Sequence, residues 1–290
     1  MRMFVVIALV VGCASTERAE RRASETVTLR GSDTMIVLTQ RWAHAFHDTH
    51  PALSMQVSGG GSGVGLAALA SGTTDVAAAS RDVEPEELAS LRTPRGEPRV
   101  LRVAVDALAV YVHRDNPLER LDVAALRGLY RGQLTHWSDV GGAPEQVVLY
   151  GRENSSGTYV YFKEHVLERL DFAAETQSLP GTAAVIQAVR RDPRGIGYGG
   201  FGFAQGVKLV AIAPSPDAPA VVPDESSAID GRYPLARFLY LVLADAPQGA
   251  TRAFLEFVLS DAGQREVVDA GFFPLPPDVL AEERAKLEAP

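Results

Sequence analysis

One segment of the sequence places a fixed positive charge close to hydroxyl groups at a helix start. Arg152 stands four residues before Ser156, which opens the sequence Ser-Gly-Thr, and apolar residues then recur every three or four positions over 159–166. This spacing predicts a helix that begins at Ser156. The first N–H groups of a helix have no partners within it, and together with the positive end of the helix dipole they favour a bound anion.

Arg152 adds what backbone amides cannot provide. Its guanidinium is permanently charged, and its planar fork can bind two oxygens of a tetrahedral oxyanion at once. The hydroxyls of Ser156 and Thr158 can supply two more hydrogen bonds. The segment therefore predicts an anion-binding site. The alternative is an ordinary helix N-cap with a surface arginine nearby.

A second donor-rich turn lies at the start of the predicted folded region. Residues 26–30 read as a strand, and Ser32, Asp33 and Thr34 connect it to a helix that begins with Met35. Ser32 and Asp33 are good capping residues, so a plain N-cap is one interpretation. The other is that the amides of Thr34 and Met35, with the Thr34 hydroxyl, form a second anion-binding site.

A third turn of this kind is rich in glycine. The stretch 58–65 follows a predicted strand at 53–57, precedes a short predicted helix at 66–71, and contains Ser62 among its glycines. Glycine lets the backbone approach a ligand closely and adopt positive φ. The stretch lacks the Gly-Lys pair of a nucleotide-binding phosphate loop, so nucleotide binding is not predicted.

The next predicted strand, 75–80, ends directly before Arg81. The carboxyl ends of parallel strands meet at one edge of a sheet, which is where open α/β sheets bind ligands. We therefore expect Thr34, Ser62 and Arg81 to converge on one point.

The remaining pattern predicts an α/β protein. The apolar run 100–113 is longer than one strand normally needs and could pass from one domain to another. Further strands are expected at 147–150, 195–198 and 238–243, and further helices at 84–91, 122–130, 183–189, 248–259 and 261–270.

The N-terminal segment is typical of an export signal. Arg2 precedes a continuous apolar run over 3–11, which is too short to span a bilayer. The run leads into Val10-Val11-Gly12-Cys13, which resembles the bacterial lipobox and contains the single cysteine of the chain. We expect a signal peptide at 1–12, a lipid anchor on Cys13, and a flexible tether over 13–25; the alternative is a chance cysteine in a simple signal.

Composition narrows the function. The net charge of −8 argues against nucleic-acid binding, and it means that an anion must be captured by local donors. No histidine or paired carboxylates accompany the donor-rich turns, so an enzyme acting on phosphoesters is disfavoured. His44, His47 and His50 share a spacing of three, but no arranged carboxylate or cysteine accompanies them, and no metal or cofactor is predicted.

Six blocks of the sequence, taken together, resemble the PstS-like phosphate-binding proteins of ABC transporters. The blocks that carry the resemblance lie in this order: Gly31-Ser32-Asp33-Thr34-Met35, Gly59-Gly60-Gly61-Ser62-Gly63, Ala79-Ser80-Arg81, Arg152 with Ser156-Gly157-Thr158, Gly195-Ile196-Gly197-Tyr198, and Tyr233-Pro234-Leu235-Ala236-Arg237.

The resemblance implies a two-lobed type II periplasmic-binding-protein fold, with each lobe a mainly parallel sheet flanked by helices and the ligand in the cleft between them. Lobe 1 would comprise 26–108 with 235–290, and lobe 2 would comprise 109–234. The chain would cross between lobes near 106–111 and 231–237.

The resemblance also implies a ligand, inorganic phosphate, and a partner, an ABC permease of the inner membrane. The implied ligand-binding residues are Ser32, Thr34, Met35, Ser62, Arg81, Arg152, Ser156, Gly157 and Thr158. The protein would act as an exported, lipid-anchored monomer. Binding of another oxyanion such as sulfate, molybdate or a phosphonate, or a sensing role, stays open.

Arg81 departs from one branch of the family, which carries aspartate at this position to accept the proton of hydrogen phosphate. One interpretation directs Arg81 into the cleft opposite Arg152, which would favour dianions and weaken the rejection of sulfate. In the other interpretation Arg81 points to solvent or pairs with Asp82 or Asp33, and one of those carboxylates becomes the acceptor.

Overall fold

The computed structural model of the protein describes residues 26–94 and 96–288. The predicted signal peptide at 1–12, the Cys13 anchor and the tether at 13–25 lie outside the described residues. Within the described residues, no helix is both long enough and apolar enough to cross a bilayer.

The fold is α/β and is built on one mixed sheet in the order β2-β1-β3-β10-β4-β8-β6-β7, with β9 paired to both β4 and β5. The strands are β1 (Thr26–Gly31), β2 (Ser54–Ser58), β3 (Val76–Ala79), β4 (Arg99–Val112), β5 (Arg120–Asp122), β6 (Val148–Arg152), β7 (Gln177–Leu179), β8 (Gly195–Gly200), β9 (Lys208–Ala213) and β10 (Ala236–Leu243). Strands β1, β2 and β3 are mutually parallel, whereas β10 runs antiparallel to β3 and β4.

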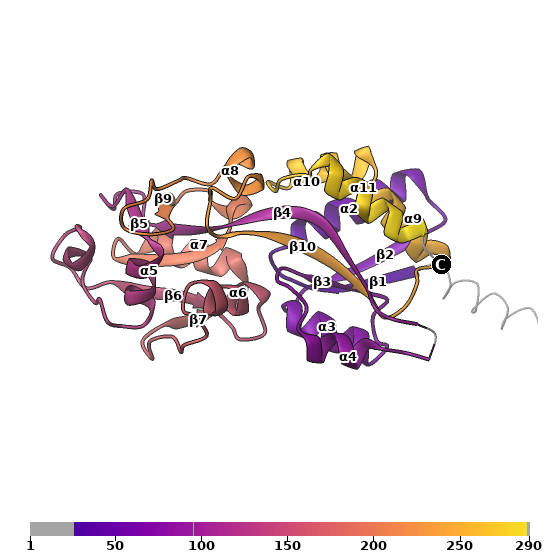
Figure 1. Ribbon diagram of the computed structural model, residues 1–290, viewed down its shortest axis with the longest axis horizontal. Coiled ribbons are helices and arrows are strands. Elements are labelled where there is room, and N and C mark those ends of the chain that lie inside the picture. The colour runs from indigo at the N-terminus through magenta and orange to yellow at the C-terminus, as the bar shows by residue number, and fades with distance from the viewer. Residues whose placement is uncertain (1–25, 95, 289–290) are drawn as a thin grey trace, which may run out of the picture.

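Strand β4 belongs to both ends of this sheet. Its residues 99–107 pair with β10, and from Leu108 onward it pairs with β8. The long apolar run of the sequence is therefore a single strand of 14 residues, although the run is longer than one strand normally needs. In Figure 1, β4 and β10 are the two strands that run between the ends of the molecule.

Helices cover the sheet at both ends. They are α2 (Ile36–Thr49), α3 (Ser62–Ala70), α4 (Pro85–Leu91), α5 (Val123–Tyr130), α6 (Gly157–His165), α7 (Gly181–Arg191), α8 (Glu225–Ile229), α9 (Gly249–Val258), α10 (Asp261–Asp269) and α11 (Pro277–Glu288), with short 3₁₀ turns at Trp137–Val140 and Phe201–Phe203. Around β1, β2 and β3, helices α2, α9, α10 and α11 lie on one side and α3 and α4 on the other (Figure 1).

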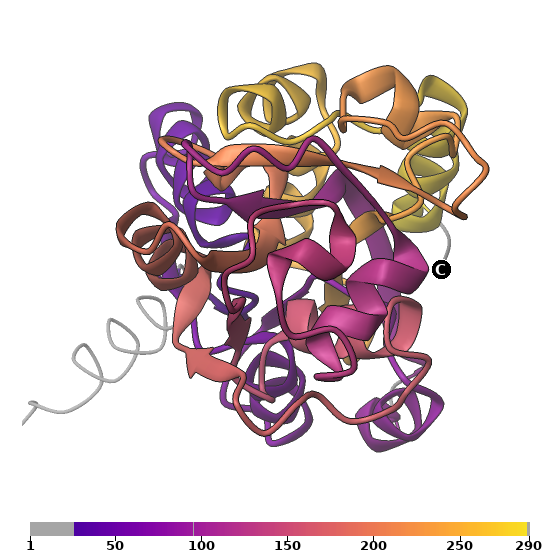
Figure 2. The ribbon, with the colours of Figure 1, turned by 90° about the vertical axis from the view of Figure 1, so that its left-hand side faces the viewer.

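Two groups of elements follow from this arrangement. The first group consists of β1–β3, α2–α4 and α9–α11, and the second consists of β5–β9 and α5–α8. Figure 2 turns the second group toward the viewer, with the first group behind it. Strands β4 and β10 serve both groups.

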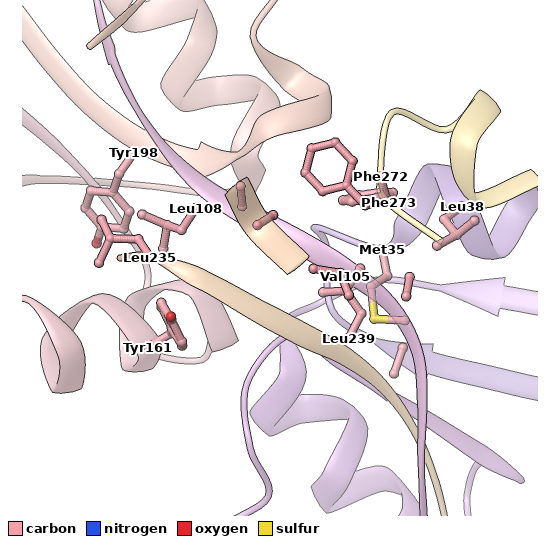
Figure 3. Close-up of a cluster of buried hydrophobic side chains, with 14 of the residues drawn as sticks. Met35, Leu38, Val105, Leu108, Tyr161, Tyr198, Leu235, Leu239, Phe272 and Phe273 are labelled. Atoms are coloured by element: carbon pink, nitrogen blue, oxygen red, sulfur yellow. The ribbon is translucent and has the colours of Figure 1, made fainter. Parts of the chain in front are cut away.

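The hydrophobic core is continuous along β4 and β10. Met35 and Leu38 of the first group join Val105 and Leu239, and the same buried cluster reaches Tyr198 of the second group (Figure 3). Burial of this apolar surface holds β4 and β10 in the middle of the molecule.

The structure corrects two sequence expectations about helices. Helix α3 begins at Ser62 rather than at Leu66, because Gly61, at φ 95°, already completes the turn. Helix α11 was not expected at all. Its buried residues are few, so its sequence carries little apolar periodicity.

Candidate anion-binding site

The donor-rich turns of the first group meet at one sheet edge. Strands β1, β2 and β3 are parallel, so the residues that follow them lie side by side. Ser62 Oγ accepts a hydrogen bond from the Ser80 amide at 3.1 Å, and the two serine hydroxyls are 3.5 Å apart. Ser80 rather than Arg81 lies beside Ser62, so the expected convergence of Thr34, Ser62 and Arg81 is wrong for Arg81.

Arg152 is the last residue of β6 and is only 1% exposed, so the surface-arginine alternative is wrong. Its Nη2 donates to Asp33 Oδ2 at 3.0 Å, and its Nη1 donates to Thr182 Oγ1 at 2.8 Å. Burial lowers the pKa of Arg152 from its ordinary value, and the nearby Asp33 carboxylate opposes that shift. An arginine remains charged at neutral pH even so.

Asp33 connects the two groups of elements. Its Oδ2 receives Arg152, and its Oδ1 accepts the Gly60 amide at 2.8 Å. Met35, the N-cap of α2, makes no side-chain capping bond. The carboxylate of Asp33 therefore faces the glycine turn and Arg152 instead of capping α2.

Gly157 brings the second group against the first. A Cβ atom at this position would lie 2.2 Å from Ser62 Oγ and 2.8 Å from Ser80 Oγ. Only a residue without a side chain fits this approach. The hydroxyls of Ser62 and Ser80 thus face the start of α6 directly.

Two threonines make the other contact between the groups. Thr34 Oγ1 lies 2.9 Å from Thr158 Oγ1, and both residues are fully buried. Ser156 is the N-cap of α6, as predicted, and its Oγ accepts from the amides of Thr158 and Tyr159 at 3.2 and 3.4 Å. Its single hydroxyl hydrogen is free to donate to another group.

An ion pair on the two shared strands lies beside these threonines. Arg237 of β10 donates to Asp106 of β4 at 2.8 and 3.1 Å and to Thr158 Oγ1 at 3.0 Å. Burial raises the pKa of Asp106, and Arg237 opposes that shift. The sequence reasoning did not place this pair in the site, although an aspartate inside the apolar run 100–113 signalled that a buried carboxylate would need a partner.

Several buried donors around these residues have no hydrogen-bond partner within the described part of the chain. They are Ser32 Oγ, Arg152 Nε and Arg237 Nη1. Buried polar groups are normally satisfied, and all three groups can donate. The surplus of donors suits an acceptor-rich ligand such as an oxyanion.

The amide of Met35, a predicted ligand group, is engaged elsewhere. The Met35 amide donates to the Ser32 carbonyl at 3.0 Å, and the Met35 side chain lies in the core (Figure 3). The Met35 amide is thus committed to a turn, in contrast to the expected anion contact.

Arg81 is paired within its own segment. Its Nη1 and Nη2 each donate to Glu87 at 2.7 Å, and Nη1 also donates to the Asp82 carbonyl at 2.8 Å. These contacts disagree with an Arg81 directed at Arg152. They also differ from the alternative, because the carboxylate partner is Glu87 of α4 rather than Asp82 or Asp33.

No metal centre accompanies the site. Within 26–94 and 96–288, no cluster of three or more histidine, cysteine or acidic side chains could hold a metal ion. His50, the residue that follows α2, stacks on Phe46 with ring centroids 4.4 Å apart.

Comparison with known proteins identifies the family. The model of the PBP superfamily domain matches residues 16–262. The phosphate-binding protein PstS of Pseudomonas aeruginosa is 37% identical over 274 residues, which cover 88% of this chain and 84% of that protein. The chain belongs to the PstS family of the PBP superfamily.

Other relatives agree. Protein SphX of Synechococcus elongatus is 31% identical across 91% of this chain and 80% of its own length. The fold is similar to the crystal structure of an ABC-type phosphate transport receptor from Vibrio cholerae, with a TM-score of 0.71 and 24% identity over 86% of this chain and all of that one. At this identity, the structural match supports the fold.

Proposed function

We propose that this PstS-family protein captures inorganic phosphate outside the cytoplasm and delivers it to an ABC permease. The observation that carries the proposal is the buried Arg152, whose guanidinium spans from β6 to Asp33 of the first group. A buried guanidinium beside further buried donors that have no partner within the described residues, Ser32 Oγ and Arg237 Nη1, suits a small tetrahedral oxyanion. The relatives named as phosphate-binding proteins support phosphate as that anion and binding, rather than catalysis, as the activity.

The two groups of elements correspond in this proposal to two lobes, 26–108 with 235–290 and 109–234. The change of partner of β4 from β10 to β8 between Ala107 and Leu108 supports a boundary there. Phosphate would lie between the lobes and favour the closed form, because only that form lets it contact both.

The ligand-binding residues would be those whose donors gather at the contact between lobes. From the first lobe these are Ser32, Thr34 and Ser62, joined by Ser80, and from the second lobe they are Arg152, Ser156, Gly157 and Thr158. A phosphate removed from water needs donors for all of its oxygens, and neither lobe alone supplies enough of them.

Asp33 is the proposed selectivity residue. Its carboxylate adjoins Arg152, whereas the Asp82 carboxylate accepts the Tyr240 hydroxyl. A carboxylate can accept a hydrogen bond from the proton of hydrogen phosphate. Sulfate has no such proton, so its oxygen, an acceptor, would face the Asp33 carboxylate, which is also an acceptor. Selection of phosphate over sulfate and molybdate, which carry no proton, is therefore the result that we expect.

Calorimetric titration with a panel of oxyanions tests this proposal. Phosphate should bind and sulfate should not compete at large excess, whereas Asp33→Asn should let sulfate compete. Native mass spectrometry should find a co-purified anion of phosphate mass. A wild-type protein that ignores phosphate, or prefers another oxyanion, would refute the proposal.

We also propose that Cys13 carries a lipid that holds the protein, as a monomer, at the outer face of a membrane. The support is the lipobox-like sequence that ends at Cys13. Cys13→Ala should release the protein from the membrane fraction or arrest its processing. Unchanged fractionation and unchanged mature mass would contradict the anchor.

A further inference from the structure

Arg237 is a second buried arginine at the contact between the two groups of elements. Its side chain is 2% exposed, and it is held by Asp106 on the adjacent strand and by the ring of Tyr161, whose centroid lies 5.2 Å from the guanidinium carbon. Asp106 is fully buried and also accepts the Phe201 amide at 3.3 Å. The guanidinium is therefore fixed from several sides.

The pair has no net charge, so it adds little to the general attraction of an anion. A buried ion pair is also weak grounds for a role in stability, because the desolvation of both charges offsets their attraction. Arg237 Nη1 has no partner within the described residues, and the guanidinium reaches the other site residues through the hydrogen bond from Nη2 to Thr158 Oγ1. Its effect on the site depends on the direction in which hydrogens are donated.

A guanidinium only donates, so Thr158 Oγ1 must be the acceptor of this bond. The contact between Thr158 and Thr34 then consumes one of their two hydroxyl hydrogens, whichever residue donates it. One hydrogen is left over in a buried place, and it requires an acceptor. An anion oxygen is such an acceptor, whereas a ligand that presents a donor would meet another donor.

We propose that Arg237 is a positioning residue for phosphate binding: its bond to Thr158 obliges the Thr158–Thr34 pair to present a hydrogen to the anion. This inference rests on the proposed function, since it assigns the pair a role toward phosphate. Without Arg237, the Thr158 oxygen could turn a lone pair toward the ligand, and its contribution to affinity would fall.

The test removes the guanidinium without leaving a buried charge. Asp106→Asn combined with Arg237→Gln neutralises both partners, and Asp106→Leu with Arg237→Met is a second neutral pair in case the first is unstable. Arg102→Gln combined with Glu283→Gln is the matched control, because Arg102 also lies on β4 and pairs with the fully buried Glu283 carboxylate. Phosphate affinity is measured by calorimetry and folding by thermal melting.

We expect the neutral pair to melt cooperatively. It should bind phosphate roughly ten- to a hundredfold more weakly than wild type, because a hydrogen bond to a charged group contributes about that much to affinity. The control should bind as wild type does. With Thr158→Val in the background, neutralising the pair should change affinity by less than about twofold, because the hydroxyl that transmits the effect is gone.

Two results would overturn the inference. A folded neutral pair that binds phosphate as wild type does would make Arg237 structural only. A full loss of affinity that persists in the Thr158→Val background would show that Arg237 acts without Thr158. Failure of the wild-type protein itself to bind phosphate would instead refute the proposed function, so the two failures are distinguishable.

Discussion

Arg81 and Arg152 each follow or end a strand, and both are buried, yet the structure uses them differently. Arg81 bonds to Glu87 through both terminal nitrogens, and the two residues are six positions apart in one segment. Arg152 reaches Asp33 with a single nitrogen across the contact between the two groups of elements. A buried arginine with a local, two-point carboxylate partner fixes its own segment, whereas one with a distant, single-point partner can share its donors with a ligand.

Removal of the arginine at the contact should have the largest effect on binding. We expect Arg152→Met to weaken phosphate binding by about thirtyfold or more, because truncation of one partner in a buried charged contact costs about 2–5 kcal/mol. Arg152→Lys should also fail largely, because an ammonium cannot reproduce the fork. Calorimetry measures the affinity. Wild-type affinity in either variant would place the anion elsewhere.

A methyl group at the closest approach should have the next largest effect. Gly157→Ala would set a Cβ 2.2 Å from Ser62 Oγ, so the two sides would have to separate. Overpacking of this kind costs about 1–3 kcal/mol, and we expect phosphate affinity to fall accordingly. Gly63→Ala is a suitable control, since its Cβ would meet its nearest neighbour at an ordinary 3.5 Å. Equal affinities of the two variants would contradict this contact.

The locally paired arginine should matter for stability and not for binding. We expect Arg81→Met to lower the free energy of unfolding by about 1–3 kcal/mol, because Glu87 loses its partner. Phosphate affinity should stay within about twofold of wild type. Denaturant unfolding and calorimetry on the same preparation separate the two effects. If a stably folded Arg81→Met protein bound phosphate more weakly than wild type, Arg81 would be part of the anion-binding site.

The smallest expected effect is a pH dependence of the Arg81–Glu87 pair. Burial alone would raise the pKa of Glu87, but hydrogen bonds from Arg81 and from the Glu84 amide bring it below the ordinary value. The stabilisation is then present above the ordinary carboxyl pKa and is lost as the pH falls through the lowered one. The difference in melting temperature between wild type and Glu87→Gln should shrink from pH 7 to pH 3. A difference in melting temperature that grows on acidification would contradict the lowered pKa of Glu87.

The sequence predicted the fold more completely than it predicted the set of residues at the site. The α/β order, the strand shared by both groups and the helix start at Ser156 all followed from periodicity and turn residues. Ser62 and Thr34 followed from the rule that parallel strand ends meet. These features depend on local sequence, which is why they were predictable.

The features that escaped prediction depend on contacts between distant segments. Ser80, rather than Arg81, faces Ser62 because successive side chains at a strand end point in opposite directions, and the sequence alone does not fix which one faces the ligand. The partners of Arg237 lie 131 and 79 positions away in the chain. No local pattern specifies such separations.

The shared strands also define how the two ends of the molecule can move. Strands β4 and β10 pair side by side from Arg99 to Ala107, with one irregularity between Leu239 and Tyr240. A two-stranded ribbon bonded along its length cannot slide one strand past the other without breaking its ladder, but it can bend and twist as a unit. If the two proposed lobes open and close, this ribbon would bend in only a few ways, so each closure should return Gly157 to the same point opposite Ser62.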